Sequence, residues 1–321
     1  MTPLPSTIMQ RLTDLQTYLA QYHSSHQSLR FEELVCQAFA ALLHLPYYDA
    51  PTDDPSQAYR VTWLGSAASL SKAPGGPDGI ARAYDFSIVI EATLKTTTKQ
   101  WSQEFNQCLD HAQHVANING LKPRDVLTVL VASKIHKHTY RAVKAQNPTN
   151  EFRIALVTTE CLGVAVETAD LAFTLRHLEV QELIRTLIDQ LAGSTSETDF
   201  SKTAITATKN WQRSVLKLEL ATALALKSYS AMVKLGRGHV GAGEILAELT
   251  VDPALGAYLE RVEGRLDTGV IERSLVQESL GKVLVRDPKQ DEAILCPVPV
   301  ADFKSRCQRR LQAVEKAHEA S

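Results

Sequence analysis

Apolar residues recur along the first half of the chain with spacings that predict alternating helices and strands. Residues 6–23 and 31–43 carry apolar side chains at intervals of three and four, which is typical of amphipathic helices. Residues 125–133 and 152–158 are nearly continuous apolar runs, which are typical of strands buried on both faces. The other predicted elements are strands over 59–64 and 85–95 and helices over 99–118, 138–146 and 171–191. This order predicts an α/β fold, a mixed sheet flanked by helices.

The predicted strand over 85–95 brings polar chemistry to one face. Side chains alternate along a strand, so the face that includes Glu91 carries a carboxylate, a hydroxyl and an amine. Its members are Ser87, Val89, Glu91, Thr93 and Lys95, whereas Ile88, Ile90, Ala92 and Leu94 are expected to face a core. The glycine-rich turn over 75–79 places Asp78 near this strand. Two carboxylates that converge on a strand end can hold a hard divalent cation. The plain alternative is a hairpin whose strand happens to end in Glu.

Two predicted helices add polar candidates. Glu32 lies at the edge of the buried side of helix 31–43, although an acid at that position also simply favours the positive helix N-terminus. On helix 99–118, Glu104, Gln107, His111 and His114 share one face at helical spacing. Because the two histidines lack an H-E-x-x-H arrangement, a solvated or capping role is expected for them.

The second half of the chain predicts a separate domain. A polar segment over 193–198 is typical of a linker, and a long helix over 209–235 follows it within the most basic stretch of the chain, residues 200–240. Helices over 243–250, 253–263 and 268–280 and a hairpin over 282–297 then suggest a winged helix, whose third helix would carry Arg273, Ser274 and Gln277 to a major groove. Acids outnumber cations across 241–321, and winged helices also serve as protein–protein modules. The predicted division is 1–192, a linker at 193–202, and a helical or winged-helix-like domain at 203–321.

Composition narrows the class of protein. The chain of 321 residues is 44% apolar and 22% charged with a net charge of −2, which is ordinary for a soluble globular protein. The chain as a whole is not basic, so its net charge does not indicate nucleic-acid binding. A nucleic-acid-binding protein of this composition would need a local patch of basic residues. The five cysteines are scattered, which argues against structural zinc and disulfides and suits a reducing cytoplasm. We expect a cytoplasmic protein without a signal peptide or membrane span.

The element order and several local phrases resemble the PD-(D/E)-x-K nucleases, in particular the cleavage domains of FokI-type and AlwI-type restriction endonucleases. The phrases are Gly76-Pro77-Asp78-Gly79, residues 90–94, Gln100-Trp101 with Glu104 and His111, and residues 129–136 leading to Thr139-Tyr140. The resemblance covers about residues 30–191. It implies a Mg²⁺-dependent DNA endonuclease of a restriction or other anti-phage defence system, with Mn²⁺ able to substitute. It also implies a homo-oligomer or a partner subunit, because a single site of this type cuts one strand.

By this resemblance Asp78 and Glu91 are metal ligands, and Glu32 orients a water or a second metal from its helix. One position departs from the pattern, because Thr93 stands where the family usually has lysine. Lys95 is about 7 Å further along the same face and can reach back, or Thr93 can act through a water. AlwI-like sequences look similar here, so an active enzyme is still expected. The alternatives are a non-cleaving DNA-binding or assembly subunit and a regulator whose C-terminal domain binds DNA.

Overall fold

The computed structural model describes residues 25–49, 59–64, 76–83, 86–171 and 177–250, with short segments at 268–269, 285–286 and 293–295. The predicted helices over 6–23 and 253–263 and nearly all of that over 268–280 lie outside the described residues. The chain forms two compact units, and the main division between them falls after Gln212. Each unit is described by itself.

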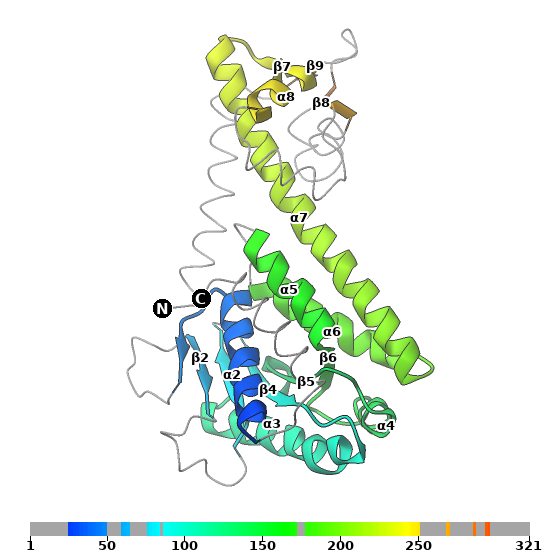
Figure 1. Ribbon diagram of the computed structural model, residues 1–321. Coiled ribbons are helices and arrows are strands. Elements are labelled where there is room, and N and C mark those ends of the chain that lie inside the picture. The colour runs from blue at the N-terminus through cyan, green and yellow to red at the C-terminus, as the bar shows by residue number, and fades with distance from the viewer. Residues whose placement is uncertain are drawn as a thin grey trace. The chain divides into compact units, whose positions relative to one another are not determined.

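A six-stranded sheet forms the centre of the first unit (Figure 1). Its strands lie side by side in chain order: β1 (Tyr47–Tyr48), β2 (Arg60–Trp63), β3 (Gly79–Arg82), β4 (Ser87–Thr93), β5 (Val126–Ala132) and β6 (Ile154–Thr158). Strands β2, β3 and β4 pair antiparallel, whereas β1 is parallel to β2, and β4, β5 and β6 are parallel to one another. The predicted mixed sheet is therefore confirmed.

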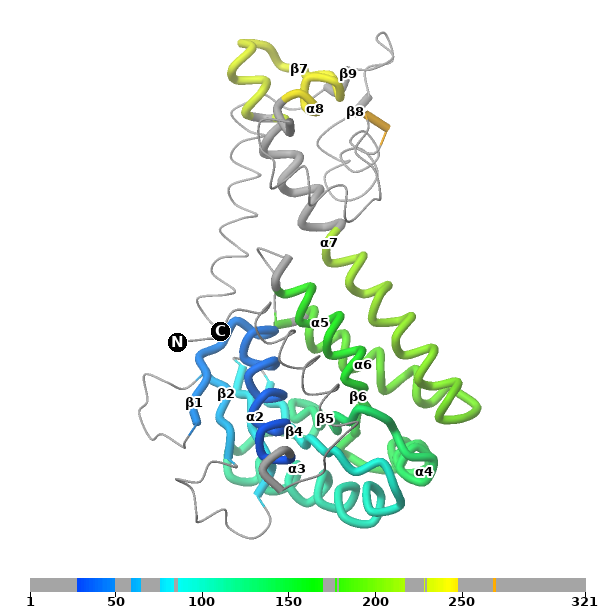
Figure 2. The backbone as a smooth tube through the Cα atoms, viewed as in Figure 1, coloured from blue at the N-terminus to red at the C-terminus, as the bar shows by residue number. Residues whose placement is uncertain are grey.

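Helices cover both faces of this sheet. Helix α2 (Ser25–Leu42) contacts β2, β3 and β4, and helix α3 (Asn106–Asn119) contacts β4 and β5 (Figure 2). Val89 packs against Ala112 and Val115 of α3. The next residue, Ile90, pairs with Gly79, which lies against Cys36 of α2. Because neighbouring residues of a strand point to opposite faces, α2 and α3 lie on opposite sides.

The remaining elements of the first unit connect and flank the parallel strands. A π-helical turn, η3 (Gln100–Phe105), leads directly into α3, and a 3₁₀ turn, η4 (Pro123–Asp125), leads into β5. The helices that follow are α4 (Lys137–Gln146), α5 (Thr159–Leu171) and α6 (His177–Gly193). Helix α6 contacts β6 and α4.

Strand β4 differs from its prediction in two ways. All seven of its residues are buried, so the face that carries Glu91 is as enclosed as the apolar face. The cause is its central position, because β3 and β5 flank it and α2 and α3 cover it. The strand also ends at Thr93 rather than at residue 95, which places Lys95 in the loop that follows.

Two helix boundaries were wrong. The prediction of one helix over 171–191 missed α5, which begins immediately after β6. Helix α7 (Glu197–Leu235) begins well before residue 209, within the segment predicted as a linker. Its threonine-rich first part has weak helix propensity. However, the hydroxyls of Thr206 and Thr208 donate to the carbonyls of Lys202 and Ala204 at 2.9 and 2.8 Å, so they are satisfied within the helix. The predicted domain boundaries otherwise stay a prediction.

The second unit contains the later part of α7 and a small sheet. Strands β7 (His239–Gly241), β9 (Ala293–Leu295) and β8 (Val285–Arg286) lie side by side in that order. Strands β8 and β9 pair antiparallel where the hairpin was predicted, and helix α8 (Ala242–Thr250) matches the helix expected over 243–250. The winged-helix assignment depends on helices outside the described residues and stays a prediction.

Candidate active site

The sheet brings Asp78 directly beside the end of β4. Backbone pairing runs from Leu64, whose N–H donates to the carbonyl of Asp78 at 2.9 Å, to Gly79, which pairs with Ile90. The Asp78 carboxylate then accepts the N–H of Ala92 through Oδ2 at 2.8 Å. Asp78 is buried, and this bond fixes its carboxylate next to the residue that follows Glu91. Asp78 thus lies at the end of β4, where the sequence predicts it.

Glu91 is the more deeply enclosed of the two acids. Its side chain lies on the α3 side of β4 and is 2% exposed. Its Oε1 is hydrogen-bonded to Nδ1 of His111, which is also buried. Burial raises the pKa of Glu91 to about 7, against the lowering effect of the His111 hydrogen bond, and the charge of Asp78 raises it further. The site therefore holds its central carboxylate in an environment that penalises its charge.

The two residues considered for the lysine position behave differently. Thr93 is buried, and its hydroxyl accepts the N–H of Lys95 at 3.2 Å. The ammonium of Lys95 forms an ion pair with Glu104, at 2.5 Å between Nζ and Oε1. The Lys95 side chain is 44% exposed, whereas that of Glu104 is 10% exposed. A positive charge is thus present at the end of β4, and a carboxylate from the following helical turn holds it.

Glu32 reaches the same region from α2. Its carboxylate is buried and accepts the hydroxyl of Ser28 through Oε1 at 3.2 Å. The buried thiol of Cys36 lies one turn further along α2, within reach of these charges. Its pKa is raised first by burial and then by the charges of Asp78, Glu32 and Glu91. The charges of all three predicted acids thus act on Cys36, although Glu32 comes from α2 and Glu91 lies on the α3 side of β4.

Gln100 closes this edge of the sheet. Its side-chain amide is fully buried and donates to the carbonyls of Lys95 and Lys134 at 2.7 and 2.9 Å. Its side-chain oxygen accepts the N–H of His136 at 2.7 Å. One side chain thus ties the loop after β4 to the loop after β5. It lies at the start of the π-helical turn, a geometry that is frequent at functional sites.

An exposed rim of aromatic and basic side chains lies beside the two loops that Gln100 joins. Trp101 is 45% exposed, and its ring lies 6.4 Å from that of His138, which in turn lies 5.2 Å from His136. Lys134 and Lys137 are exposed in the same loop and at the start of α4. Basic side chains beside an exposed aromatic ring are typical of surfaces that meet nucleic acid.

The residues can be tested for their fit to a divalent metal. Among the described residues, no group of three or more His, Cys, Asp or Glu side chains is arranged to hold a metal ion. Asp78 and Glu91 nevertheless supply two carboxylates at one strand end. Mg²⁺ in phosphoryl-transfer sites is usually held by one or two carboxylates together with waters and substrate phosphate. The donor set is therefore of the right chemical type for Mg²⁺, and its metal binding stays a prediction.

Three functional candidates received no role from the sequence pattern alone. The expectation of a solvated or capping role was wrong for His111, which is buried against Glu91. His114 is exposed, which agrees with the solvated role expected for it. Glu104 and Gln100 are also buried and engaged with the site loops. The helical spacing of Glu104 and His111 was visible, but only the packing of α3 on β4 shows that these two of the four polar residues turn inward.

Comparison with known proteins supports the resemblance drawn from the motifs. Residues 67–157 match the sequence model of a protein family. The family is the AlwI restriction endonuclease. This segment contains Asp78, Glu91, Thr93, Lys95, Gln100 and His111, so the predicted resemblance to restriction endonucleases is confirmed where the site lies. No curated protein sequence matches the chain.

Among solved structures, one similar chain is the small subunit of the heterodimeric restriction endonuclease R.BspD6I. It is 16% identical, the match covers 64% of this chain and 98% of that chain, and the TM-score is 0.42. Separately, none of the described helices is long and apolar enough to cross a membrane.

Proposed function

We propose that this protein is a metal-dependent DNA endonuclease that hydrolyses phosphodiester bonds, within a restriction or other anti-phage defence system. The observation that carries the proposal is the placement of Asp78 beside Glu91 at the end of β4, inside the segment that matches the AlwI family. Two buried carboxylates at a strand end are costly to fold, and a function that needs them explains their presence.

The chain's own residues have distinct parts in this proposal. Asp78 and Glu91 would hold Mg²⁺, which when bound stabilises negative charge on phosphate oxygens and lowers the pKa of water. His111 keeps the Glu91 carboxylate in one orientation, and the Ala92 N–H does the same for Asp78. Lys95 supplies a positive charge beside the phosphate, and the rim around Trp101 meets the DNA backbone and bases. Because one site cuts one strand, a double-strand break requires a second copy or a partner subunit.

A second function is favoured by a specific observation. Thr93 stands at the position of the family's lysine, and Lys95 is already paired with Glu104. A chain that keeps the fold for DNA binding or assembly and does not cut would need no free lysine at this point. We therefore carry the non-cleaving subunit as the alternative.

The deciding experiment is incubation of the purified protein with supercoiled plasmid in Mg²⁺, Mn²⁺ or EDTA. Wild type is compared with Asp78→Asn, which keeps an oxygen for the Ala92 N–H, and with Asp110→Asn, an exposed acid on α3. Metal-dependent nicking that is lost in Asp78→Asn and kept in Asp110→Asn supports the endonuclease. DNA binding without cleavage, equal in all three proteins, supports the alternative.

A further inference from the structure

A pocket of about 440 Å³ opens at the opposite edge of the sheet from the candidate active site. It is lined by Val126, the first residue of β5, and by Arg153, which immediately precedes β6. The candidate active site lies at the C-terminal end of β4. Since β4, β5 and β6 are parallel, the two features lie at opposite ends of the strands.

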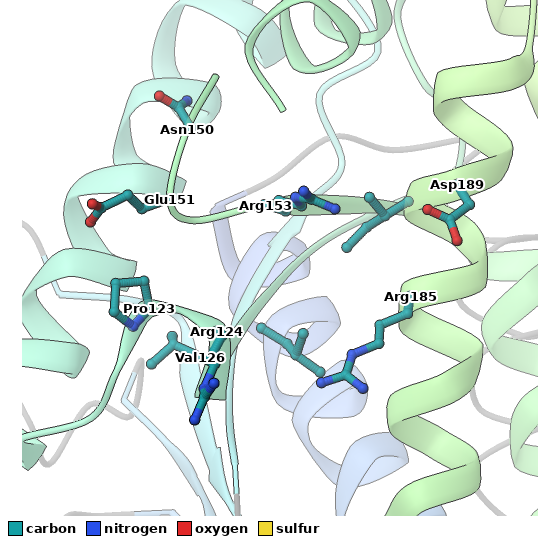
Figure 3. Close-up of a pocket in the computed structure, with 10 residues that line it drawn as sticks. Pro123, Arg124, Val126, Asn150, Glu151, Arg153, Arg185 and Asp189 are labelled. Carbon is teal, nitrogen blue, oxygen red and sulfur yellow. The ribbon is translucent and has the colours of Figure 1, made fainter. Parts of the chain in front are cut away.

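Three guanidinium groups from separate elements line this pocket. Arg124 comes from η4, Arg153 from the loop before β6 and Arg185 from α6 (Figure 3). Within the described part of the chain, neither Arg153 nor Arg185 forms an ion pair, and Arg124 reaches only its neighbour Asp125, at 3.6 Å. All three arginines are exposed, and the lining also carries the carboxylates of Glu151 and Asp189. The guanidinium groups outnumber the carboxylates, so an anionic group can pair with an arginine that forms no ion pair within the described residues.

The rest of the lining suits an organic molecule rather than a bare ion. Val126, Leu127 and Ile188 are buried and give the pocket an apolar floor. The polar groups Asn150, Glu151 and Asp189 can accept hydrogen bonds from hydroxyl or amino groups. The volume lies within the range of about 300–1,000 Å³ that is usual for small-molecule sites. An anionic group attached to a partly apolar body with hydroxyl and amino donors is the ligand that this lining complements.

We propose that this pocket binds the phosphate of a nucleotide. Guanidinium groups bind phosphate through two parallel hydrogen bonds, which makes arginine the residue best suited to this anion. The apolar floor would take the base, and Glu151 and Asp189 would accept from ribose hydroxyls or base amino groups. The phosphate belongs either to a free nucleotide or to the end of a nucleic-acid strand, since both present the same chemistry. The site is separate from the proposed cleavage chemistry.

The test is isothermal titration calorimetry of the full chain in EDTA, which prevents metal-dependent cleavage from contributing. The probes are AMP, ATP, adenosine, and an oligonucleotide with or without a 5′-phosphate. We expect AMP or ATP to bind and adenosine to bind at least about tenfold more weakly. Arg153→Ala and Arg185→Ala should each weaken binding about tenfold or more, because each removes charge-assisted hydrogen bonds. Arg185→Lys should lie between, since it keeps the charge but loses the paired geometry.

Arg141→Ala is the matched control, because Arg141 is an exposed arginine of α4 that does not line the pocket. It should bind within about twofold of wild type. Preference for the phosphorylated oligonucleotide over the mononucleotide, lost in Arg153→Ala, assigns the site to a strand end; the reverse assigns it to a free nucleotide. The proposal is overturned if no phosphate-bearing probe binds, or if the pocket variants bind as tightly as Arg141→Ala. Circular dichroism melts establish that each variant is folded.

Discussion

His111 on α3 is hydrogen-bonded through Nδ1 to Oε1 of Glu91 on β4, and both side chains are almost completely buried. An imidazole that faces a buried carboxylate fixes the orientation of that carboxylate and offsets part of the cost of its charge. The contact ties the strand that carries the proposed chemistry to the helix that covers it. Glu91 is thus held by packing as well as by its position on the strand.

Replacement of His111 by alanine should strongly destabilise the protein. The change leaves a buried carboxylate without its imidazole partner, and loss of one member of a buried pair costs about 3–5 kcal/mol. Thermal unfolding followed by circular dichroism at pH 8 measures the effect. The loss should shrink towards pH 5, where Glu91 takes up a proton and no longer carries the buried charge that the imidazole stabilises.

His114→Ala is the matched control for that change, because His114 is exposed on the same helix and should change stability by less than about 0.5 kcal/mol. A double-mutant cycle with Glu91→Gln then isolates the pair. If His111→Ala costs as much in the Glu91→Gln background as in wild type, the contact does not explain the role of His111.

The buried charge of Glu91 should make stability depend on pH. Burial raises the pKa of Glu91 to about 7 from an ordinary value of 4.5. Between these two values the folded state binds more protons than the unfolded chain, so the free energy of unfolding falls as the pH rises and levels off above about 7. The glutamine of the Glu91→Gln variant cannot ionise, so the variant's free energy of unfolding does not fall in this way as the pH rises. At pH 8 we expect it to be more stable than wild type by about 1–3 kcal/mol.

The measurement is the difference in unfolding free energy between Glu91→Gln and wild type from pH 5 to pH 8. This difference should grow with pH and then stay constant. Asp110→Asn serves as the control, because that exposed carboxylate is not removed from water by folding. A difference for Glu91→Gln that is flat across the whole range would contradict the argument.

Lys95 should matter for cleavage more than for stability. Its ion pair with Glu104 is partly exposed, and such pairs contribute at most about 1 kcal/mol. If the lysine stands beside the scissile phosphate, Lys95→Ala should lower the rate of plasmid nicking by about 100-fold, as the loss of one charge-stabilising group typically does. Single-turnover nicking rates measure this. Lys99→Ala, which removes a nearby exposed lysine, should leave the rate within a few-fold; equal rates for both variants would exclude Lys95 from the chemistry.

Gly79 should be intolerant of any side chain. A Cβ atom at this position would lie 2.3 Å from Sγ of Cys36 and 3.1 Å from the carbonyl oxygen of Thr62. Gly79→Ala should therefore cost about 1–3 kcal/mol, which is typical of overpacking, and shift the thermal midpoint downwards. Cys36→Ala removes the sulfur and should recover part of that loss in the double variant. Gly193 lies at the end of α6, and a Cβ atom added there would meet no atom within 4 Å. Gly193→Ala should therefore have little effect on stability.

Much of the site could be predicted from the sequence because its signals are local. Glycine and proline at 76–79 specify a turn, and the two-residue period of a strand places Glu91 and Thr93 on one face whatever the rest of the chain does. The apolar runs of β5 and β6 mark buried parallel strands for the same reason. The structure places Asp78 against the strand end, as this local reasoning predicts.

The rest required tertiary structure, because it depends on which elements pack together. His111 and His114 are equivalent in helical spacing, and only the rotation of α3 on β4 turns the first towards Glu91 and leaves the second in solvent. Gln100 joins Lys95 to Lys134 and His136, which are separated from it by 34 and 36 positions, and no local pattern encodes such a contact. The arginine pocket likewise joins η4, the loop before β6 and α6. Local preferences are encoded in neighbouring residues, whereas the environment that sets charge, pKa and partner is created only when distant segments exclude water together.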